Sequence, residues 1–235
     1  MTFRVIDTET CGLDAGVVEI ASLDLSDTGI SNVMSNLVNP GRPIGLDAMA
    51  IHHITQEMVA DKPRIARVIG RYQGSAYYVA HNAAFDRRML PEMNGAWICT
   101  LKLARKLYPG IKYGNQYLRY ALKLQVAPPA GLYPHRALYD CYVTAALLMK
   151  IRQDSGWSPE EMVAISNEAM LLSSLKFGKY RGQPLAQIAR DDPGYLHWLL
   201  ANLRDLSADL RYSLNYHLSG AASEAQRHAE GHTGE

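Results

Sequence analysis

The alternation of apolar and polar positions near the start of the chain predicts β-strands. Phe3–Asp7 is a short apolar run, Val17–Leu25 alternates apolar and polar side chains, and Ile30–Val38 alternates more loosely. The turn sequence Asp27-Thr28-Gly29 separates the last two runs and predicts a hairpin, so we expect the sheet to begin with antiparallel strands. Asn39–Pro43 ends this meander, because proline cannot donate a hydrogen bond within a sheet.

Further along, strands alternate with helices. Ala76–Ala80 and Trp97–Thr100 are predicted as buried strands, each followed by a helix. Shorter helices are expected from Thr55 and over Pro63–Tyr72, and Arg136–Arg152 is predicted as a long helix. Strands followed by alternating strands and helices predict an α/β fold, with a mixed central sheet flanked by helices.

The pattern changes after residue 153. Phe177–Gly182 has glycines at both ends of a short basic and aromatic run and predicts a tight β element, and helices are expected near Asp192 and from Ser207 to about Leu218. From residue 220 the apolar periodicity is lost. We therefore expect a first domain over 1–153, a helical linker over 154–172, a small C-terminal α+β module over 173–219 and a disordered tail over 220–235.

Composition indicates a globular protein with a real core, since 48% of the residues are hydrophobic and 20% are charged. We see no signal peptide and no apolar run long enough to cross a bilayer. The three cysteines, Cys11, Cys99 and Cys141, are odd in number and widely spaced, which favours reduced thiols and a cytoplasmic protein.

The net charge of +1 does not by itself indicate a nucleic-acid-binding protein. Positive charge is nevertheless concentrated in two stretches, one over residues 102–123 and one containing Lys176, Lys179 and Arg181. Each stretch is either a nucleic-acid contact or an ordinary solvated face. Beside Tyr180, the second stretch combines basic and aromatic groups, which favours a DNA-gripping module over a protein-docking module.

Two acids end the first predicted strand. Side chains alternate across a strand, so Asp7 and Glu9 point to one side and Thr8 points to the other. Two carboxylates held together repel each other unless a cation lies between them, and oxygen ligands of this kind favour Mg²⁺ or Mn²⁺. Alone, such a triplet is usually a solvated strand end.

Two later blocks change that interpretation. His81–Asp86 follows a predicted strand, and His135–Asp140 opens the long predicted helix. Together with Asp7–Glu9, these blocks resemble the DEDDh family of 3′→5′ exonucleases over the whole catalytic domain, about residues 1–153, in the family's order. Ala48–Thr55, Phe177–Gly182 and the stretch Asp192–Leu199 extend the resemblance, while Cys11 replaces the family's commoner threonine.

The resemblance implies a ribonuclease H-like fold and hydrolysis of DNA from 3′ ends to 5′-mononucleotides. It implies two Mg²⁺ ions, replaceable by Mn²⁺, on four carboxylates: Asp7, Glu9, Asp86 and Asp140. It implies His135 as the general base. The DNA partner would be single- or double-stranded with a 3′ end, in the setting of DNA repair.

The resemblance also implies residues that contact the substrate: Thr8, Thr10, Ile51, His52, His81 and Phe85. A core position for Phe85 stays open, as does a role in packing a turn for Ile51 and His52. Leu13 lies between Gly12 and Asp14, and we expect it either to wedge under the terminal base or to fold into the core.

Taken singly, the same residues have simpler explanations. Asp140 would be a surface acid, Asp86 would pair with Arg87 or Arg88 for about 0.5 kcal/mol, and His135 would be a loop histidine. Their joint occurrence favours the metal site. Two alternatives remain: a related enzyme, either a polymerase proofreading subunit or an RNase acting on 3′ tails, and a non-catalytic module that binds nucleic-acid ends.

Overall fold

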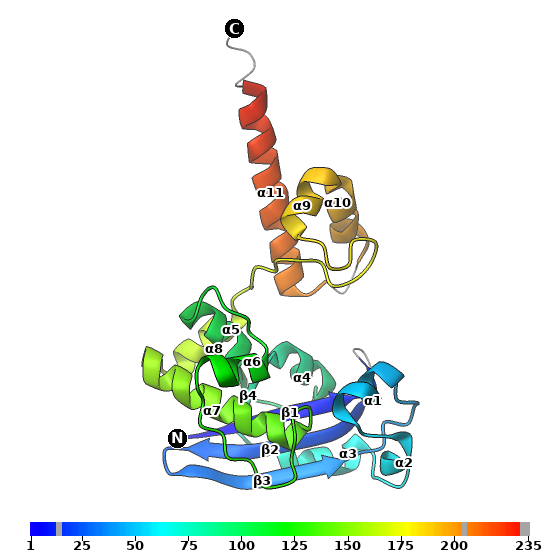
Figure 1. The fold of residues 1–235 in the computed structure, drawn as a ribbon, viewed down its shortest axis with the longest axis vertical. Coiled ribbons are helices and arrows are strands. Elements are labelled where there is room, and N and C mark those ends of the chain that lie inside the picture. Colours follow the sequence, from blue (N-terminus) through cyan, green and yellow to red (C-terminus); the bar gives the residue numbers. More distant parts are fainter. Residues whose placement is uncertain (13–15, 204–205, 231–235) are drawn as a thin grey trace. The chain divides into compact units, whose positions relative to one another are not determined.

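The computed structural model describes residues 1–12, 16–203 and 206–230, with only the backbone described over 221–230 (Figure 1). The chain divides into two compact units, Met1–Asn167 and Glu168–Glu235. This boundary falls within the stretch 154–172 that the sequence predicts as a linker.

The first unit is built on a five-stranded mixed sheet, as its sequence pattern predicts. The strand order is β3-β2-β1-β4-β5, so β1 lies at the centre of the sheet (Figure 1). The first three strands pair antiparallel and the last two join in parallel. The strands are β1 (Thr2–Thr10), β2 (Val17–Ser26), β3 (Gly29–Leu37), β4 (Tyr77–Ala80) and β5 (Ala96–Cys99).

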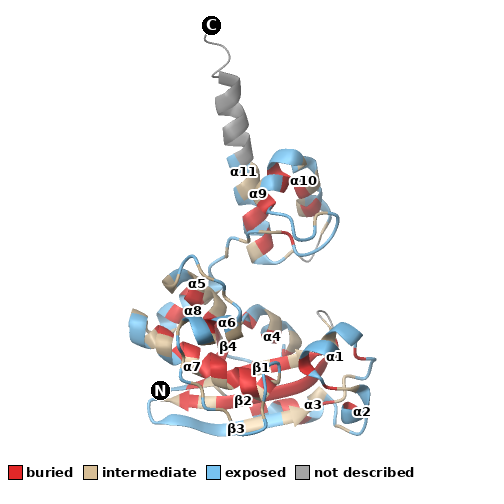
Figure 2. Ribbon diagram, viewed as in Figure 1, coloured by how far each residue is buried: buried red, intermediate tan, exposed pale blue. Residues whose placement is uncertain are grey.

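Helices cover both faces of this sheet, and the buried residues lie on the strands and the inner helix faces (Figure 2). One core joins the sheet to α5, α7 and α8; the other joins it to α3, the following 3₁₀ turn and α4. The helical elements of this unit are α1 (Leu46–His52), α2 (Gln56–Val59), α3 (Ile65–Val68), the 3₁₀ turn (Ile69–Tyr72), α4 (Ala83–Met89), α5 (Thr100–Leu107), α6 (Asn115–Ala121), α7 (Ala137–Ser155) and α8 (Pro159–Asn167).

Helix α8 belongs to the first unit although the sequence places it in a linker. Its Met162 and Ile165 are buried in the core with α5 and α7. The Ser166 hydroxyl accepts a hydrogen bond of 2.8 Å from the backbone N–H of Cys99, at the end of β5. The apolar face of the helix is thereby removed from water, which explains why the unit ends at Asn167.

The second unit packs α9 (Leu185–Asp191), α10 (Pro193–Asn202) and α11 (Ala208–Glu230) around a leucine-rich core. The predicted β element at Phe177–Gly182 is a turn, and the unit's described residues form one isolated β-bridge, Ser174 to Pro184. Helix α11 runs past its predicted end near Leu218, because the alanines, glutamates and glutamine that follow have high helix propensity. Residues 231–235 of the predicted tail lie outside the described residues.

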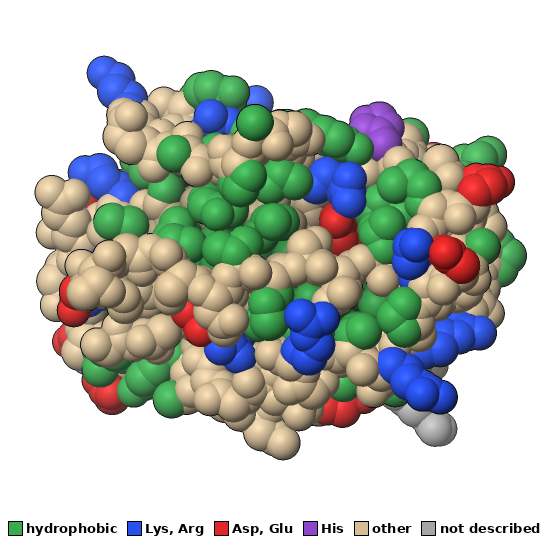
Figure 3. Space-filling view, turned by 90° about the horizontal axis from the view of Figure 1, so that it is seen from below, with side chains coloured by type: hydrophobic (Ala, Val, Ile, Leu, Met, Phe, Trp, Pro, Cys, Tyr) green, Lys and Arg blue, Asp and Glu red, His purple; other side chains and the backbone are tan. Residues whose placement is uncertain are grey.

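In the view of Figure 3, Lys and Arg side chains are spread over the surface among hydrophobic, acidic and other polar ones, with a few of them adjacent at the lower right. All three cysteines are buried free thiols, as predicted. Within the described part of the chain, every helix is too short or too polar to span a bilayer.

Candidate metal centre

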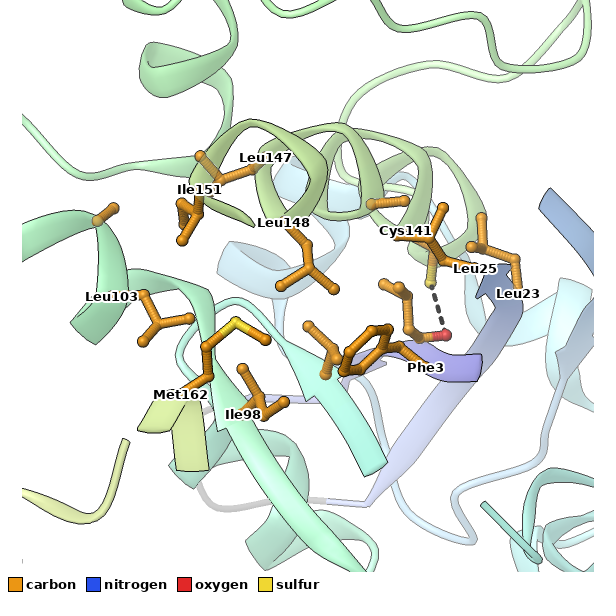
Figure 4. Packing of buried hydrophobic residues seen from close by; sticks show 14 of the residues in the cluster. Phe3, Leu23, Leu25, Ile98, Leu103, Cys141, Leu147, Leu148, Ile151 and Met162 are labelled. Carbon is orange, nitrogen blue, oxygen red and sulfur yellow. Dashed lines mark hydrogen bonds between the residues drawn. The ribbon is translucent and has the colours of Figure 1, made fainter. Parts of the chain in front are cut away.

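Strand β1 and helix α7 bring three carboxylates together. Phe3 and Val5 of β1 pack into the α7 core, where Phe3 lies near Leu148 (Figure 4). Because strand side chains alternate, Asp7 and Glu9 continue on that face toward α7. Oxygens of Asp7, Glu9 and Asp140 lie within 4.8 Å of one another.

Asp140 is fixed in place by two hydrogen bonds. The Gln116 side-chain amide donates to Oδ1 at 2.8 Å, and the backbone N–H of His135 donates to Oδ2 at 3.0 Å. Asp140 lies in the first turn of α7 and is buried. A negative side chain in a first helical turn is favoured by the helix dipole, so the site is partly organised before any cation binds.

Asp86, the fourth predicted ligand, is not one of the three acids whose oxygens lie within 4.8 Å of one another, but its charge acts on Asp7. It comes from the first turn of α4 and is buried, and its Oδ1 accepts a 2.8 Å hydrogen bond from the Thr8 hydroxyl. Thr8 is the residue of β1 that points away from Asp7 and Glu9, toward α4. The charge of Asp86 still reaches Asp7, because it raises the pKa of that carboxyl.

Burial and mutual repulsion oppose ionisation of the four acids. Burial, followed by the charges of Asp86, Glu9 and Asp140, raises the pKa of Asp7 well above its ordinary value. Burial is also the main cause that raises the pKa of Glu9 to about 8 and that of Asp86 to about 7. Burial raises the pKa of Asp140 as well, against the hydrogen bonds that it accepts.

The donor set fits hard divalent cations. Every candidate ligand atom is a carboxylate oxygen, which suits Mg²⁺ and Mn²⁺ and disfavours softer metals. A cation between the carboxylates would replace their repulsion with attraction and lower the pKa values that burial raises. The acids therefore form a candidate site for hard cations.

His135 is placed directly before α7 and is exposed to solvent. Its backbone has a left-handed φ of 64°, which is uncommon for a residue other than glycine. The backbone N–H is held by Asp140, while the imidazole has no hydrogen-bond partner among the described residues. The main chain at His135 is thus anchored to a candidate metal ligand and the ring is left accessible.

Sequence reasoning missed an ion pair that holds this segment. Glu19 of β2 faces Glu9 across the β1–β2 ladder and is buried. Its two oxygens accept hydrogen bonds of 2.9 Å and 2.6 Å from Arg136, and one of them also accepts the backbone N–H of Ala137 at 3.0 Å. The sequence does contain a signal for this pair. Glu19 is the one charged residue within the run 17–21, and Arg136 directly follows His135.

Replacing Glu19 with alanine is expected to destabilise the protein by about 3 kcal/mol. The Arg136 side chain is only 17% exposed and would lose its negative partner, and the backbone N–H of Ala137 would lose its acceptor. The matched control is Asp27→Ala, which breaks an exposed pair with Arg152 and should cost less than about 1 kcal/mol. Urea unfolding of both variants measures the difference. Equal losses would contradict a structural role for the Glu19 pair.

The two predicted substrate-contact histidines have their ring nitrogens engaged. His52 is buried; its Nε2 donates to the Thr10 carbonyl at 3.2 Å and its Nδ1 accepts the Ile54 N–H at 2.9 Å. His81 donates through Nε2 to the Tyr113 carbonyl at 2.7 Å, and burial lowers its pKa to about 4. Both rings hydrogen-bond to backbone carbonyls, and a nucleotide contact by either one remains a prediction.

The other predicted contacts differ in exposure. Thr10 is buried and its hydroxyl donates to the Gly12 carbonyl at 2.8 Å. Ile51 is 52% exposed, while Phe85 is half-buried with the Arg88 guanidinium 5.6 Å from its ring centroid. Leu13, the predicted wedge, lies outside the described residues. Among Thr10, Ile51 and Phe85, Ile51 has the most exposed side chain and could reach a nucleotide base without rearrangement.

Comparison with family models gives two matches. Residues 5–148 match the model described as "Exonuclease", and residues 175–204 match the model described as "Exodeoxyribonuclease X-like C-terminal". The first match contains all four acids and His135. The second covers the turn and α10 of the second unit.

Comparison with curated proteins finds an Escherichia coli K12 protein named exodeoxyribonuclease 10, 58% identical over 215 residues, which are 92% of this chain and 98% of the relative. A PolC-type DNA polymerase III from Bacillus subtilis is 31% identical, over 66% of this chain and only 12% of the polymerase.

Among solved structures, exonuclease X in complex with 5′ overhanging duplex DNA is 62% identical. It covers 70% of this chain and 99% of its own, with a TM-score of 0.69. Escherichia coli exonuclease I, solved with a dT13 oligonucleotide, is 14% identical with a TM-score of 0.58 and shows a shared fold.

Proposed function

Since the chain belongs to the exonuclease family, we propose that it hydrolyses DNA stepwise from 3′ ends and releases 5′-mononucleotides. The observation that carries this proposal is the convergence of Asp7, Glu9 and Asp140 within 4.8 Å, with His135 beside them. Deoxyribose substrates are favoured because the relative that spans nearly the whole chain is named an exodeoxyribonuclease. DNA repair is the proposed setting.

In phosphodiester hydrolysis the four acids would hold the cations and His135 would act as the general base. Divalent cations held by the acids would supply positive charge where negative charge develops on the attacking and departing oxygens. His135 takes the proton from the attacking water at a ring nitrogen, for which its exposed and unpaired imidazole is suited. Asp140 holds the backbone of His135, and Glu19 holds Arg136 directly after it, so the main chain that carries the ring is fixed on both sides.

Two Mg²⁺ ions are the proposed cofactors, with Mn²⁺ as an effective substitute. Asp7 shares one position with Glu9 and Asp140, and its pKa is also raised by the charge of Asp86, so it interacts with all three other acids. Asp7 would therefore help to hold both ions, and Glu9 and Asp140 would hold the first with it. Asp86, hydrogen-bonded through one oxygen to Thr8, would serve the second ion.

The alternatives are less well supported. A proofreading subunit is less well supported because the PolC-type match covers only 66% of this chain, whereas the exodeoxyribonuclease match covers 92% and residues 175–204 match an exodeoxyribonuclease X-like model. A non-catalytic end-binding module would have no need for four acids and an accessible histidine in one place. An RNase acting on 3′ tails is separated from the proposal by experiment.

The test is digestion of 5′-end-labelled single- and double-stranded DNA and RNA of one sequence, with Mg²⁺ and with EDTA. We expect DNA to shorten progressively from its 3′ end with Mg²⁺ and to remain intact with EDTA. Faster loss of RNA than of DNA would contradict the sugar preference. Endonucleolytic fragments, or digestion in EDTA, would contradict the proposed chemistry.

A further inference from the structure

The second unit presents a rigid turn against α10. The Gly182 N–H donates to the Leu175 carbonyl at 2.7 Å, and the Gln183 N–H donates to the Tyr180 carbonyl at 3.0 Å. Gly178 has a left-handed φ of 69°, and a Cβ at this position would come within 2.5 Å of the Tyr195 hydroxyl oxygen. Glycine therefore lets the turn sit directly on the Tyr195 side chain.

Three aromatic rings continue from this turn along α10. Tyr180 meets Tyr195 edge to face at 5.1 Å between ring centroids, and Tyr195 stacks with Trp198 at 6.1 Å with an interplanar angle of 17°. Leu196 and Leu199 of the same helix are buried in the unit's core, so α10 turns its leucines inward and Trp198 outward. Trp198 is 52% exposed, which leaves ring surface for another flat group.

Positive charge borders these rings. Lys176, Lys179 and Arg181 are exposed on the turn. The Lys179 ammonium lies 4.6 Å from the Tyr180 ring centroid and 3.2 Å from an oxygen of Asp192. Among the described residues, the side chains of Lys176 and Arg181 have no ion-pair partner.

Two acids, Asp191 and Asp192, precede α10; Asp191 is exposed, and Asp192 is hydrogen-bonded to the turn and the helix. Asp192 caps α10 by accepting the Tyr195 N–H at 3.1 Å, and it also accepts the Tyr180 hydroxyl at 2.8 Å. Its charge is therefore used to fix the turn to the helix, and the turn itself presents three cations and no acid. A surface of this kind repels cationic partners and attracts polyanions.

We propose that the turn–α10 surface, made of Lys176, Lys179, Tyr180, Arg181 and Trp198, is a binding site for single-stranded DNA. A base stacks on Trp198 and the flanking phosphates lie against the cations of the turn, the combination by which single strands are held without sequence preference. Charge complementarity favours this occupant over an apolar protein segment. The inference rests on the proposed function.

The proposed reaction explains the need for such a site. Hydrolysis of one strand of a duplex from its 3′ end leaves the complementary strand unpaired, and this single strand grows with each nucleotide removed. A second unit that binds the unpaired strand would keep the enzyme on its substrate between cleavage steps. It would lower KM without changing the chemical step.

The test measures binding of a fluorescent dT oligonucleotide of about 15 nucleotides to the full chain in EDTA, where no hydrolysis occurs. Trp198→Ala should raise Kd at least about fivefold, because stacking of one base contributes about 1–3 kcal/mol. Trp198→Phe should recover part of the affinity. Tyr212→Ala is the matched control, since Tyr212 is 45% exposed on α11, outside the surface, and its loss should leave Kd unchanged.

Two further readouts separate this proposal from the proposed function. With Mg²⁺, Trp198→Ala should raise KM for DNA and leave kcat within about twofold, because Trp198 is neither a candidate metal ligand nor the proposed general base. Double replacement of Lys176 and Arg181 by alanine should reduce the dependence of Kd on salt. Unchanged Kd in both variants would overturn the DNA site, whereas a wild-type enzyme that binds dT without hydrolysing it would overturn only the proposed function.

Discussion

Replacing Asp7 with asparagine is expected to lower the rate of DNA hydrolysis by about 10³-fold or more. Asparagine keeps the size of the side chain and removes the charge that interacts with Glu9, Asp140 and Asp86. Loss of a ligand to the cations that stabilise the transition state costs several kcal/mol, and about 4 kcal/mol corresponds to this factor. The measurement is single-turnover hydrolysis of an end-labelled oligonucleotide at saturating Mg²⁺.

Asp47→Asn provides the control for this variant, because Asp47 is an exposed acid in the first turn of α1. It should retain wild-type activity. In EDTA, Asp7→Asn should also unfold at no lower temperature than the wild type, since it removes one of the charges that repel each other. A variant with activity within about tenfold of wild type would show that Asp7 is not a metal ligand in the working enzyme.

Replacing His135 with asparagine is expected to lower kcat by about 10²–10⁴-fold while Kd for DNA in EDTA stays unchanged. Asparagine tolerates the left-handed backbone that this position requires, with φ at 64°, so the fold around Asp140 is kept while the base is lost. Because hydroxide replaces the missing base, the defect should shrink as pH rises. A rate measured across pH in single-turnover conditions tests both points.

The matched control is His53→Asn, at another histidine with a left-handed φ, in this case 57°. Its ring packs near Tyr133, with 6.1 Å between centroids, and within the described part of the chain it has no hydrogen bond or ion pair to the four acids. The His53 variant should keep kcat within about threefold. Equal losses in the two variants would indicate a backbone effect and would contradict a proton-transfer role for His135.

The central sheet and the shared face of Asp7 and Glu9 were predictable from local pattern, whereas Asp140 was assigned to the same site by the family resemblance. A period of two places Asp7 and Glu9 on one face of a strand, and the apolar Phe3 and Val5 specify that this face meets a helix. The long helix that begins just after His135 was also clear from its apolar positions. Asp140 follows within its first turn, so the meeting of the acids needs only that α7 crosses β1.

Other features depend on contacts that sequence does not encode locally. His52 has both ring nitrogens bonded to backbone groups, and His81 has Nε2 bonded to the Tyr113 carbonyl and Nδ1 3.0 Å from the Thr100 hydroxyl. A histidine's identity in the sequence does not reveal such partners. The ion pair of Glu19 was missed for the same reason, because its partner Arg136 lies 117 residues further along the chain. Asp86 was predicted as a ligand, but its hydrogen bond to Thr8 became visible only in three dimensions.

In the second unit, glycines at both ends of Phe177–Gly182 predict a tight reversal and do not distinguish a hairpin from a turn. The segment between Leu175 and Gln183 is too short to add a ladder beyond the single bridge, so the turn closes on itself. In α11, the loss of apolar periodicity after Leu218 signals the end of packing and not the end of the helix, because helix propensity continues.

The pH dependence of stability follows from the raised pKa values of the acids. Folded-state pKa values above the ordinary ones mean that the folded protein binds more protons than the unfolded chain, so stability falls as pH rises from about 4 to about 8. A bound divalent cation compensates the ionised acids. Its stabilising effect is therefore expected to be largest at the upper end of this range.

Thermal unfolding at about pH 8, with Mg²⁺ or Mn²⁺ and with EDTA, tests most directly whether the clustered acids hold divalent cations. We predict that either cation raises the Tm of the wild type, and that the rise is smaller at about pH 5 and absent in Asp7→Asn. A wild-type Tm that does not respond to either cation, or an equal rise in the Asp7 variant, would contradict the metal centre and with it the proposed chemistry.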